Sequence, residues 1–181
     1  MNEVHDRPSR LTLVYPSVRY EAEFRDMMAE WEQTGEKIEP FVLRMDDEDF
    51  AAYVSALERM KTEPTGHRKT VNSSTFWSID GEGRMIGAVN IRHELNEHLL
   101  KIGGHISFGI RPGARRRGYA VEQLRLALSE AGRLGLSRVL VTCDEDHEGA
   151  RRTILRCGGV LENETFFNGK RVQRYWIDLQ P

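Results

Sequence analysis

Apolar residues alternate with polar or small residues over residues 105–110, and they recur at three- and four-residue spacing over residues 121–134. The first pattern predicts a β-strand and the second predicts a helix that begins near Gly118 and buries one apolar stripe. On the strand we expect Ile106, Phe108 and Ile110 on one face and His105, Ser107 and Gly109 on the other. Pro112-Gly113 ends the strand, because proline lacks an amide donor and glycine accepts turn geometries.

The same reasoning places the remaining elements. We expect strands over 11–15, 74–79, 85–91, 138–143, 160–166 and 172–179, and helices over 17–33, 50–60 and from the turn at 144–147 to 157. Gly81-Glu82-Gly83 and Asn168-Gly169 predict two hairpin turns, and residues 62–70 form a polar linker. This order predicts a mixed α/β (α+β) sheet and not a doubly wound one.

The junction of strand and helix near residues 111–120 is suited to bind an anion. A helix N-terminus carries unpaired N–H groups and a partial positive charge. Gly118 and Ala120 have almost no side chain, so a ligand can approach the backbone, and Arg115 to Arg117 add positive charge. These features together predict a phosphate-binding turn. The spacing matches neither a P-loop nor a dinucleotide-binding fingerprint.

The pattern Arg115-x-x-Gly118-x-Ala120, directly after a strand, resembles the signature of the GNAT superfamily of N-acyltransferases. The segments 92–104, 158–163 and 173–176 are similar to those of a bacterial subgroup of acetyltransferases within that family. The resemblance extends over about residues 75–181 and is looser before them, and we treat 1–181 as a single GNAT domain. It implies a mostly antiparallel sheet with flanking helices, in which the two central parallel strands, containing Phe108 and Val139, splay apart.

The resemblance implies acetyl-CoA as cosubstrate and assigns residues that bind it. The backbone of Phe108 and Ile110 would hold the pantetheine arm and the acetyl carbonyl. Arg115, Arg116, Arg117, Gly118, Tyr119 and Ala120 would hold the pyrophosphate. His147 stands where many family members have an asparagine that contacts pantetheine, and a histidine can donate the same hydrogen bond. The alternatives are a solvated basic turn and, for His147, a water-exposed position at a helix N-terminus.

Acetyl transfer also needs a deprotonated amine, and His105 is the first candidate for the base. It opens the strand at a place where some GNAT enzymes have a carboxylate, and its ordinary pKa of about 6.5 suits proton removal at neutral pH. Glu94, His93 and His98 are near in sequence and could serve instead, and a purely structural role is the alternative for each of these residues. Ile154 occupies the position of the tyrosine that protonates the leaving thiolate in many family members. The sequence resembles no serine or cysteine triad, and neither cysteine has an evident histidine partner. We therefore expect an amine to attack bound acetyl-CoA directly in a ternary complex, without a covalent nucleophile.

Composition and cysteine spacing lead to expectations about the cellular compartment of the protein and about metal binding. The chain is 39% hydrophobic and 30% charged, which is typical of a soluble globular protein. Its apolar runs fall short of the roughly 20 residues that span a bilayer, and its first ten residues lack the apolar region of a signal peptide. Cys143 and Cys157 match no metal-binding or redox spacing. We expect a reduced, cytoplasmic protein that binds neither a metal nor a membrane.

Charge is unevenly distributed, and this bears on the partners. Residues 1–100 carry 12 Lys/Arg and 19 Asp/Glu, whereas residues 101–181 carry 14 and 9. A basic half suits CoA, and an acidic half could attract an amine, either a small molecule or a peptide. A non-catalytic CoA-binding or sensor domain and a nucleic-acid-binding module built on 111–125 are the alternative functions. Arginines without interleaved aromatic residues are weak support for nucleic acid, which we do not expect as a partner, and a homodimer remains open.

Overall fold

The computed structural model describes residues 10–63 and 70–179. The strands are β1 (Leu11–Val14), β2 (Ser73–Asp80), β3 (Met85–Arg92), β4 (Ile106–Ile110), β5 (Arg138–Asp144), β6 (Val160–Phe167) and β7 (Lys170–Asp178). The α-helices are α1 (Glu21–Glu32), α2 (Phe50–Arg59), α3 (Glu97–Lys101), α4 (Tyr119–Arg133) and α5 (Glu148–Arg156). Three short 3-10 turns, η1 (Val18–Tyr20), η2 (Phe41–Arg44) and η3 (Pro112–Ala114), complete the described elements.

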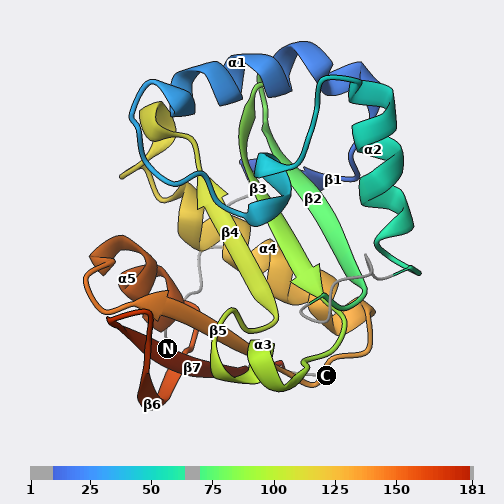
Figure 1. Ribbon diagram of the computed structural model, residues 1–181. Coiled ribbons are helices and arrows are strands. Elements are labelled where there is room, and N and C mark those ends of the chain that lie inside the picture. Colours follow the sequence, from blue (N-terminus) through green and yellow to red (C-terminus); the bar gives the residue numbers. More distant parts are fainter. Residues whose placement is uncertain (1–9, 64–69, 180–181) are drawn as a thin grey trace, which may run out of the picture.

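The strands form two antiparallel sheets, one with the order β1-β2-β3-β4 and the other with the order β5-β7-β6. Helices α1 and α2 cover one face of the first sheet, and α4 crosses its other face (Figure 1). Phe24 and Trp77 are fully buried on the α1 side, while Leu124 of α4 packs with Ile106 on the other. The alternation along each strand therefore separates two cores, as expected from the sequence.

The second sheet buries one face against α4 and α5. Val139, Val141 and Tyr175 from this sheet join Ile154 of α5 in the same core as the α4 stripe. The result confirms the predicted mixed, mostly antiparallel architecture with flanking helices. Among the described residues, no helix is both long enough and apolar enough to cross a membrane.

Strands β4 and β5 meet only near their amino-terminal ends. The His105 N–H donates to the Leu140 carbonyl at 2.7 Å, and toward their carboxyl ends the two strands belong to separate sheets. Gly104 permits this approach, because a Cβ on it would lie 2.4 Å from the Leu140 oxygen and its φ is +61°. The predicted splay of the central strands is thus present.

Several element boundaries differ from those expected. Strand β4 begins at Ile106, and η1 precedes α1, so that Ser17 makes no side-chain cap. The polar segment after β3 folds into the short helix α3, whose first turn is capped where Asn96 Oδ1 accepts the Leu99 N–H at 2.9 Å. With Leu99 as its one buried residue, α3 is too short to show a helical period in the sequence. Residues 64–69 of the predicted linker lie outside the described residues.

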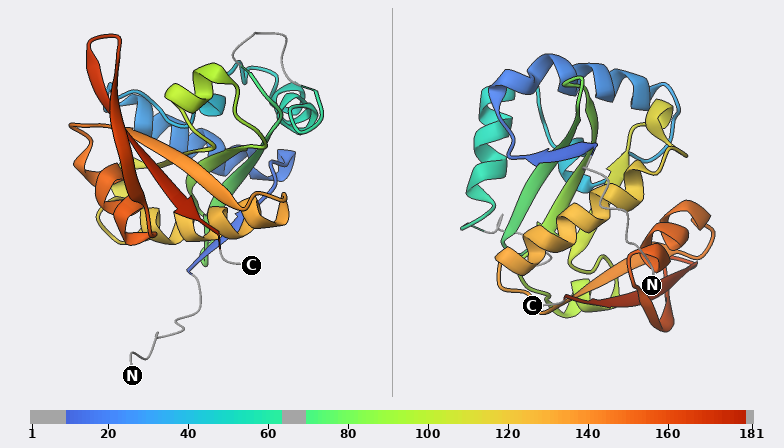
Figure 2. Two further views of the ribbon diagram at one scale, coloured as in Figure 1. Left: turned by 90° about the horizontal axis from the view of Figure 1, so that it is seen from below. Right: turned by 180° about the vertical axis from the view of Figure 1, so that it is seen from behind.

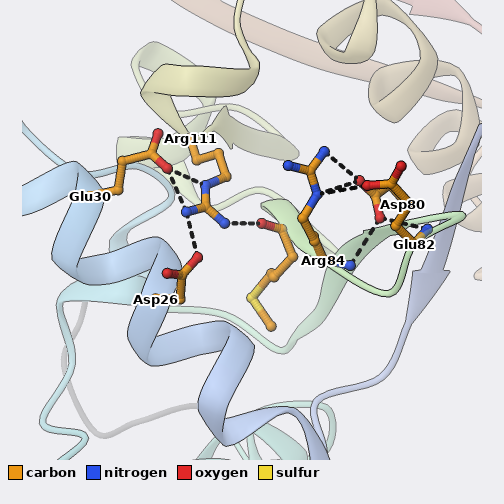
Figure 3. A network of polar contacts seen from close by, with 7 residues as sticks. Asp26, Glu30, Asp80, Glu82, Arg84 and Arg111 are labelled. Carbon is orange, nitrogen blue, oxygen red and sulfur yellow. Dashed lines mark hydrogen bonds and ion pairs between the residues drawn. The ribbon is translucent and has the colours of Figure 1, made fainter.

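A buried arginine joins α1 to the end of β4 (Figure 3). Arg111 is 8% exposed and donates to Glu30 Oε2 at 2.7 Å, to Asp26 Oδ2 at 2.7 Å and to the Met85 carbonyl at 3.1 Å. Glu30 also accepts the N–H of Gly113 in η3. Burial raises the pKa of Glu30, but the bonds from Gly113 and Arg111 outweigh it, so the net pKa is lowered. The turn after β4 is therefore fixed against α1.

Removal of Arg111 should destabilise the fold more than removal of one of its exposed partners. Arg111→Met removes the positive charge that pairs with Glu30 and the donor to the Met85 carbonyl, and we expect the free energy of unfolding to fall by roughly 2–3 kcal/mol. Asp26→Asn should cost less than about 1 kcal/mol, because the Asp26 side chain is 66% exposed. Urea unfolding followed by circular dichroism measures both losses, and equal losses would contradict this assignment.

Candidate active site

The turn between β4 and α4 presents a row of backbone donors. Arg116 and Gly118 both have positive φ, at +61° and +85°, and Gly118 is the N-cap of α4. Within the described part of the chain, the backbone N–H groups of residues 116–121 donate no hydrogen bond to the protein. A side chain at Gly118 would be both strained and close to Arg10, so glycine keeps this surface open. Free N–H groups at the start of a helix suit an anion, so this turn stays the predicted phosphate site.

The arginines of this turn have different roles. The Arg115 guanidinium donates to the Ile110 carbonyl at 3.1 Å, pairs with Glu36 at 2.7 Å and lies over the Trp31 ring. Its side chain therefore braces the end of β4 against α1 and the segment after it, and only its backbone faces the turn. Arg116 and Arg117 are exposed and add positive charge there.

Two other predicted residues of the turn also contribute through their backbone. The Tyr119 side chain is 8% exposed and packs in a small core, with the Arg10 guanidinium 4.4 Å from the centre of its ring. Ala120 is half-buried against the same core. Both residues are in the first turn of α4, where backbone N–H groups have no partner within the helix.

The edge of β4 next to this turn is unpaired in its sheet. β4 is the last strand of the first sheet. Backbone hydrogen bonds to β3 at both ends of β4 show that the odd-numbered residues of this strand direct backbone groups toward β3. These bonds run from Arg92 N–H to His105 O and from Arg111 N–H to Ile86 O. Successive residues of a strand direct their backbone groups to opposite sides. The backbone N–H and C=O groups of Phe108 and Ile110 therefore point away from β3, toward the space where β4 and β5 separate. The sequence assigned these two residues to cofactor binding.

His105 lies at the point where β4 and β5 meet and is 7% exposed. Its Nδ1 accepts the Leu140 N–H at 2.9 Å. Burial, assisted by the positive charge of Arg92, lowers the pKa of His105 to about 4. At neutral pH the ring is uncharged, and with Nδ1 engaged as an acceptor its proton is on Nε2. This geometry argues against the predicted role of His105 as the general base and gives it a positioning role instead.

Arg92 supplies the fixed charge beside His105. It donates to the carbonyls of Gly103 and Gly104 at 3.2 and 3.0 Å, and it lies over the Phe41 ring of η2. Burial lowers the pKa of Arg92, and the charge of Glu39 partly restores it. Arg92 thereby joins the loop before β4 to the segment that follows α1.

The remaining candidates form no hydrogen bond or ion pair with His105 in the described part of the chain. Glu94 is exposed in the bend after β3, and its charge acts on the neighbouring His93; no contact among the described residues brings it to His105. His147 is exposed and is the N-cap of α5, where its Nδ1 accepts the Ala150 N–H at 3.1 Å. Its Nε2 remains able to donate outward. Ile154 is fully buried and offers no acid.

Neither cysteine has the properties of a nucleophile. Both are free thiols, and burial raises the pKa of Cys143 and of Cys157 to about 11. Both are therefore protonated at neutral pH, and only the thiolate is an effective nucleophile. In the described ranges, no group of three or more His, Cys, Asp or Glu side chains is placed to hold a metal ion.

Sequence reasoning missed the residues that support the site from a distance. Gln123 of α4 is fully buried and donates to Ser78 Oγ at 2.7 Å and to the Gly109 carbonyl at 3.3 Å. A polar residue within the apolar stripe of α4, next to Leu124, is the signal in the sequence that could have identified Gln123 as a supporting residue. Glu36, which holds Arg115, has no such signal because the contact joins two loops far apart in the sequence.

Comparisons with known proteins agree with this geometry. The family described as acetyltransferase (GNAT) domain matches residues 10–160. The chain therefore belongs to the GNAT acetyltransferase family, which confirms the resemblance found in the sequence. A search of curated proteins found no match.

Solved structures share the fold at low sequence identity. A proposed ribosomal-protein-serine acetyltransferase from Vibrio cholerae is 18% identical, with 95% of each chain covered and a TM-score of 0.64. The acetyltransferase from Salmonella typhimurium that modifies the N-terminal serine of ribosomal protein L7/L12 is 13% identical, with 95% of this chain and 96% of that chain covered and a TM-score of 0.66. The microcin C7 self-immunity acetyltransferase MccE, solved with acetyl-CoA and AMP, is 17% identical, with coverage of 95% and 97% and a TM-score of 0.63.

The depressed pKa of His105 makes stability depend on pH. The unfolded chain takes up a proton near pH 6.5, whereas the folded protein does so only near pH 4, so stability is lost as pH falls through this range. His105→Asn keeps an acceptor for the Leu140 N–H but does not titrate. Urea unfolding across this range should show that the wild type loses on the order of 2–3 kcal/mol more than the variant. Parallel losses would contradict a buried neutral His105.

Proposed function

We propose that the protein transfers an acetyl group from acetyl-CoA to an amine by direct attack in a ternary complex. The observation that carries this proposal is the row of backbone N–H groups at residues 116–121, which have no acceptor among the described residues and lie next to the edge of β4 that faces away from β3. Such a row suits a pyrophosphate, and the free strand edge suits the amide groups of a pantetheine arm.

The residues of this chain fit acetyl-CoA. The 116–121 amides would accept the pyrophosphate oxygens, with Arg116 and Arg117 supplying exposed positive charge. The backbone of Phe108 and Ile110 would pair with the pantetheine arm, and the outward Nε2 of His147 would donate to it from the start of α5. Acetyl-CoA supplies the acetyl group as a thioester. A backbone N–H on the β4 edge, directed at the acetyl oxygen, would stabilise the negative charge that develops there.

The protonation state of the two cysteine side chains supports direct transfer. Cys143 and Cys157 are protonated at neutral pH, so a route through an acetylated cysteine is disfavoured. His105 holds the amino-terminal end of β4 in place and leaves proton removal from the amine to another group. We propose a small-molecule amine or a peptide as the acceptor. The amine acceptors in the names of similar structures, such as spermidine for the Vibrio cholerae enzyme SpeG, are in line with this class.

A non-catalytic CoA-binding domain is the second candidate, and the burial of Ile154 favours it. A tyrosine at that position could protonate the leaving thiolate, whereas Ile154 is enclosed in the core. The two functions differ in a simple observation. An enzyme releases free CoA thiol from acetyl-CoA when an amine is supplied, whereas a sensor binds both forms of CoA without turnover.

The assignment of the cofactor turn predicts an effect of charge at Gly118. Gly118→Glu should weaken acetyl-CoA binding at least about 100-fold in calorimetric titration, because a carboxylate would occupy the place of the pyrophosphate. Gly135→Glu is the matched control: Gly135 also has a positive φ, of +91°, and follows the opposite end of α4. The control variant should bind as the wild type does. If both variants bind equally, acetyl-CoA does not use this turn.

A further inference from the structure

Arg92 is the one arginine in residues 10–63 and 70–179 that is not exposed and yet forms no ion pair. Glu39, whose charge partly offsets the effect of burial on the pKa of Arg92, pairs instead with Lys37 at 2.7 Å. The other arginines that are not exposed each pair with an aspartate or a glutamate: Arg25, Arg111, Arg115, Arg151 and Arg174. A charge removed from water without an opposite charge is costly, so Arg92 is suited to receive an anion from outside the chain.

The guanidinium of Arg92 has two donors in the position that a carboxylate needs. Arg92 donates through Nη1, to two backbone carbonyls before β4, and its Nε and Nη2 have no acceptor among the described residues. Arg111 divides its donors in the same way: Nη1 binds a backbone carbonyl, while Nε and Nη2 bind Glu30 and Asp26 (Figure 3). The Nε and Nη2 edge of a guanidinium matches the two oxygens of a carboxylate. Arg92 therefore presents the donors that Arg111 uses for acids.

Arg92 lies on the face of the first sheet that α1 and α2 cover. It shares its side of β3 with Ala88, which belongs to the core under those helices. Helix α4 crosses the opposite face, as the view from behind in Figure 2 shows. The Phe41 ring of η2 lies 5.6 Å from the Arg92 guanidinium, so an aromatic ring helps to fix its orientation.

Other polar groups on this face also have no protein partner. Asn90 is fully buried, and its Oδ1 receives no hydrogen bond, although its Nδ2 donates to Ser73 and Thr75. Ser107 lies opposite Asn90 on β4 and is half-buried, and its hydroxyl forms no hydrogen bond within the described part of the chain. Buried polar atoms without a partner are rare in folded proteins. Together with Arg92 they indicate a place for a polar ligand.

The strand register places Arg92 close to the proposed position of the acetyl group. Its N–H donates to the His105 carbonyl at 2.7 Å, so Arg92 is the diagonal neighbour of Ser107 across the strand pair. Such neighbours have Cα atoms about 7–8 Å apart. Ser107 directly precedes Phe108, whose backbone we assign to the pantetheine arm and the acetyl carbonyl. One small molecule could therefore reach both Arg92 and the acetyl group.

We propose that the acceptor is an amino acid, whose carboxylate binds Nε and Nη2 of Arg92 while its amine attacks the acetyl group beside Phe108. This inference rests on the proposed acetyl transfer and narrows its acceptor. The amine nitrogen bonds to the acetyl carbon, and the carbon–sulfur bond breaks with its electron pair on sulfur. The proton that the amine loses ends on the CoA thiol, so the products are an N-acetyl amino acid and CoA. A polyamine lacks the anion and meets the positive charge of Arg92 unfavourably.

Release of the CoA thiol tests the acceptor. The twenty amino acids are supplied singly with acetyl-CoA, and the best of them is then compared with its own amide and with spermidine. The wild type should have a kcat/KM for the amino acid at least about 10-fold above that for the amide, because the amide lacks the negative charge. Spermidine should be a poorer acceptor than the amino acid.

The ratio of acid to amide separates substrate binding from a structural role of Arg92. Arg92→Gln should bring this ratio close to one, mainly through a higher KM for the amino acid, whereas a structural defect would affect both substrates equally. Arg92→Lys keeps the charge but not the paired donors, and it should retain part of the preference. Arg44→Gln is the matched control, because Arg44 is an exposed arginine of η2, and it should leave the ratio unchanged.

Calorimetric titration with acetyl-CoA shows whether each variant is folded and binds the donor, and the Arg92 variants should bind it as the wild type does. Amides or spermidine used as well as amino acids, or a ratio that Arg92→Gln and Arg92→Lys leave unchanged, would overturn this inference and leave acetyl transfer in place. Binding of acetyl-CoA without thiol release for any amine would instead overturn the proposed acetyl transfer, and this inference with it.

Discussion

The junction of His105 and Leu140 is the contact on which the site depends. Two hydrogen bonds join these residues: the His105 backbone donates to the Leu140 carbonyl, and the Leu140 N–H donates to the His105 ring. The imidazole thus takes the place of a backbone acceptor in a strand pair. Because this pairing stops there, β4 and β5 separate, and the backbone of Phe108 and Ile110 is left on a free edge. A longer pairing would use the groups that we assign to the cofactor.

The structure surrounding this edge is held by side chains, so that backbone donors remain available. Arg111 anchors the turn after β4 to α1, and Arg115 binds the Ile110 carbonyl together with Glu36. Gln123 supports β4 from α4. Each of these contacts restrains the turn or the strand without occupying an N–H group of residues 116–121. The basic motif is therefore partly structural: the Arg115 side chain positions the turn, and we propose that the backbone that follows it binds the cofactor.

Much of the fold was predictable from the sequence, because alternation and helical spacing report burial directly. The pattern over 105–134 predicted β4, the turn and α4, with Gly118 at the start of the helix. The properties of His105 were not predictable in the same way. Its low pKa and its acceptor role arise from Leu140 and Arg92, which reach it through tertiary packing. Likewise, α3 escaped detection because five residues with one buried side chain show no period.

The most direct test of the account is a titration of the 15N-labelled protein with acetyl-CoA, followed by the chemical shifts of its backbone amides. We expect the largest changes at residues 116–121 and at Phe108 and Ile110, because these amides would gain hydrogen-bond acceptors. The amide of Leu140 should change little, since its bond to His105 already exists. Saturable binding with shifts confined to other parts of the chain, or no binding, would contradict the claim that the splay of β4 and β5 creates the cofactor site.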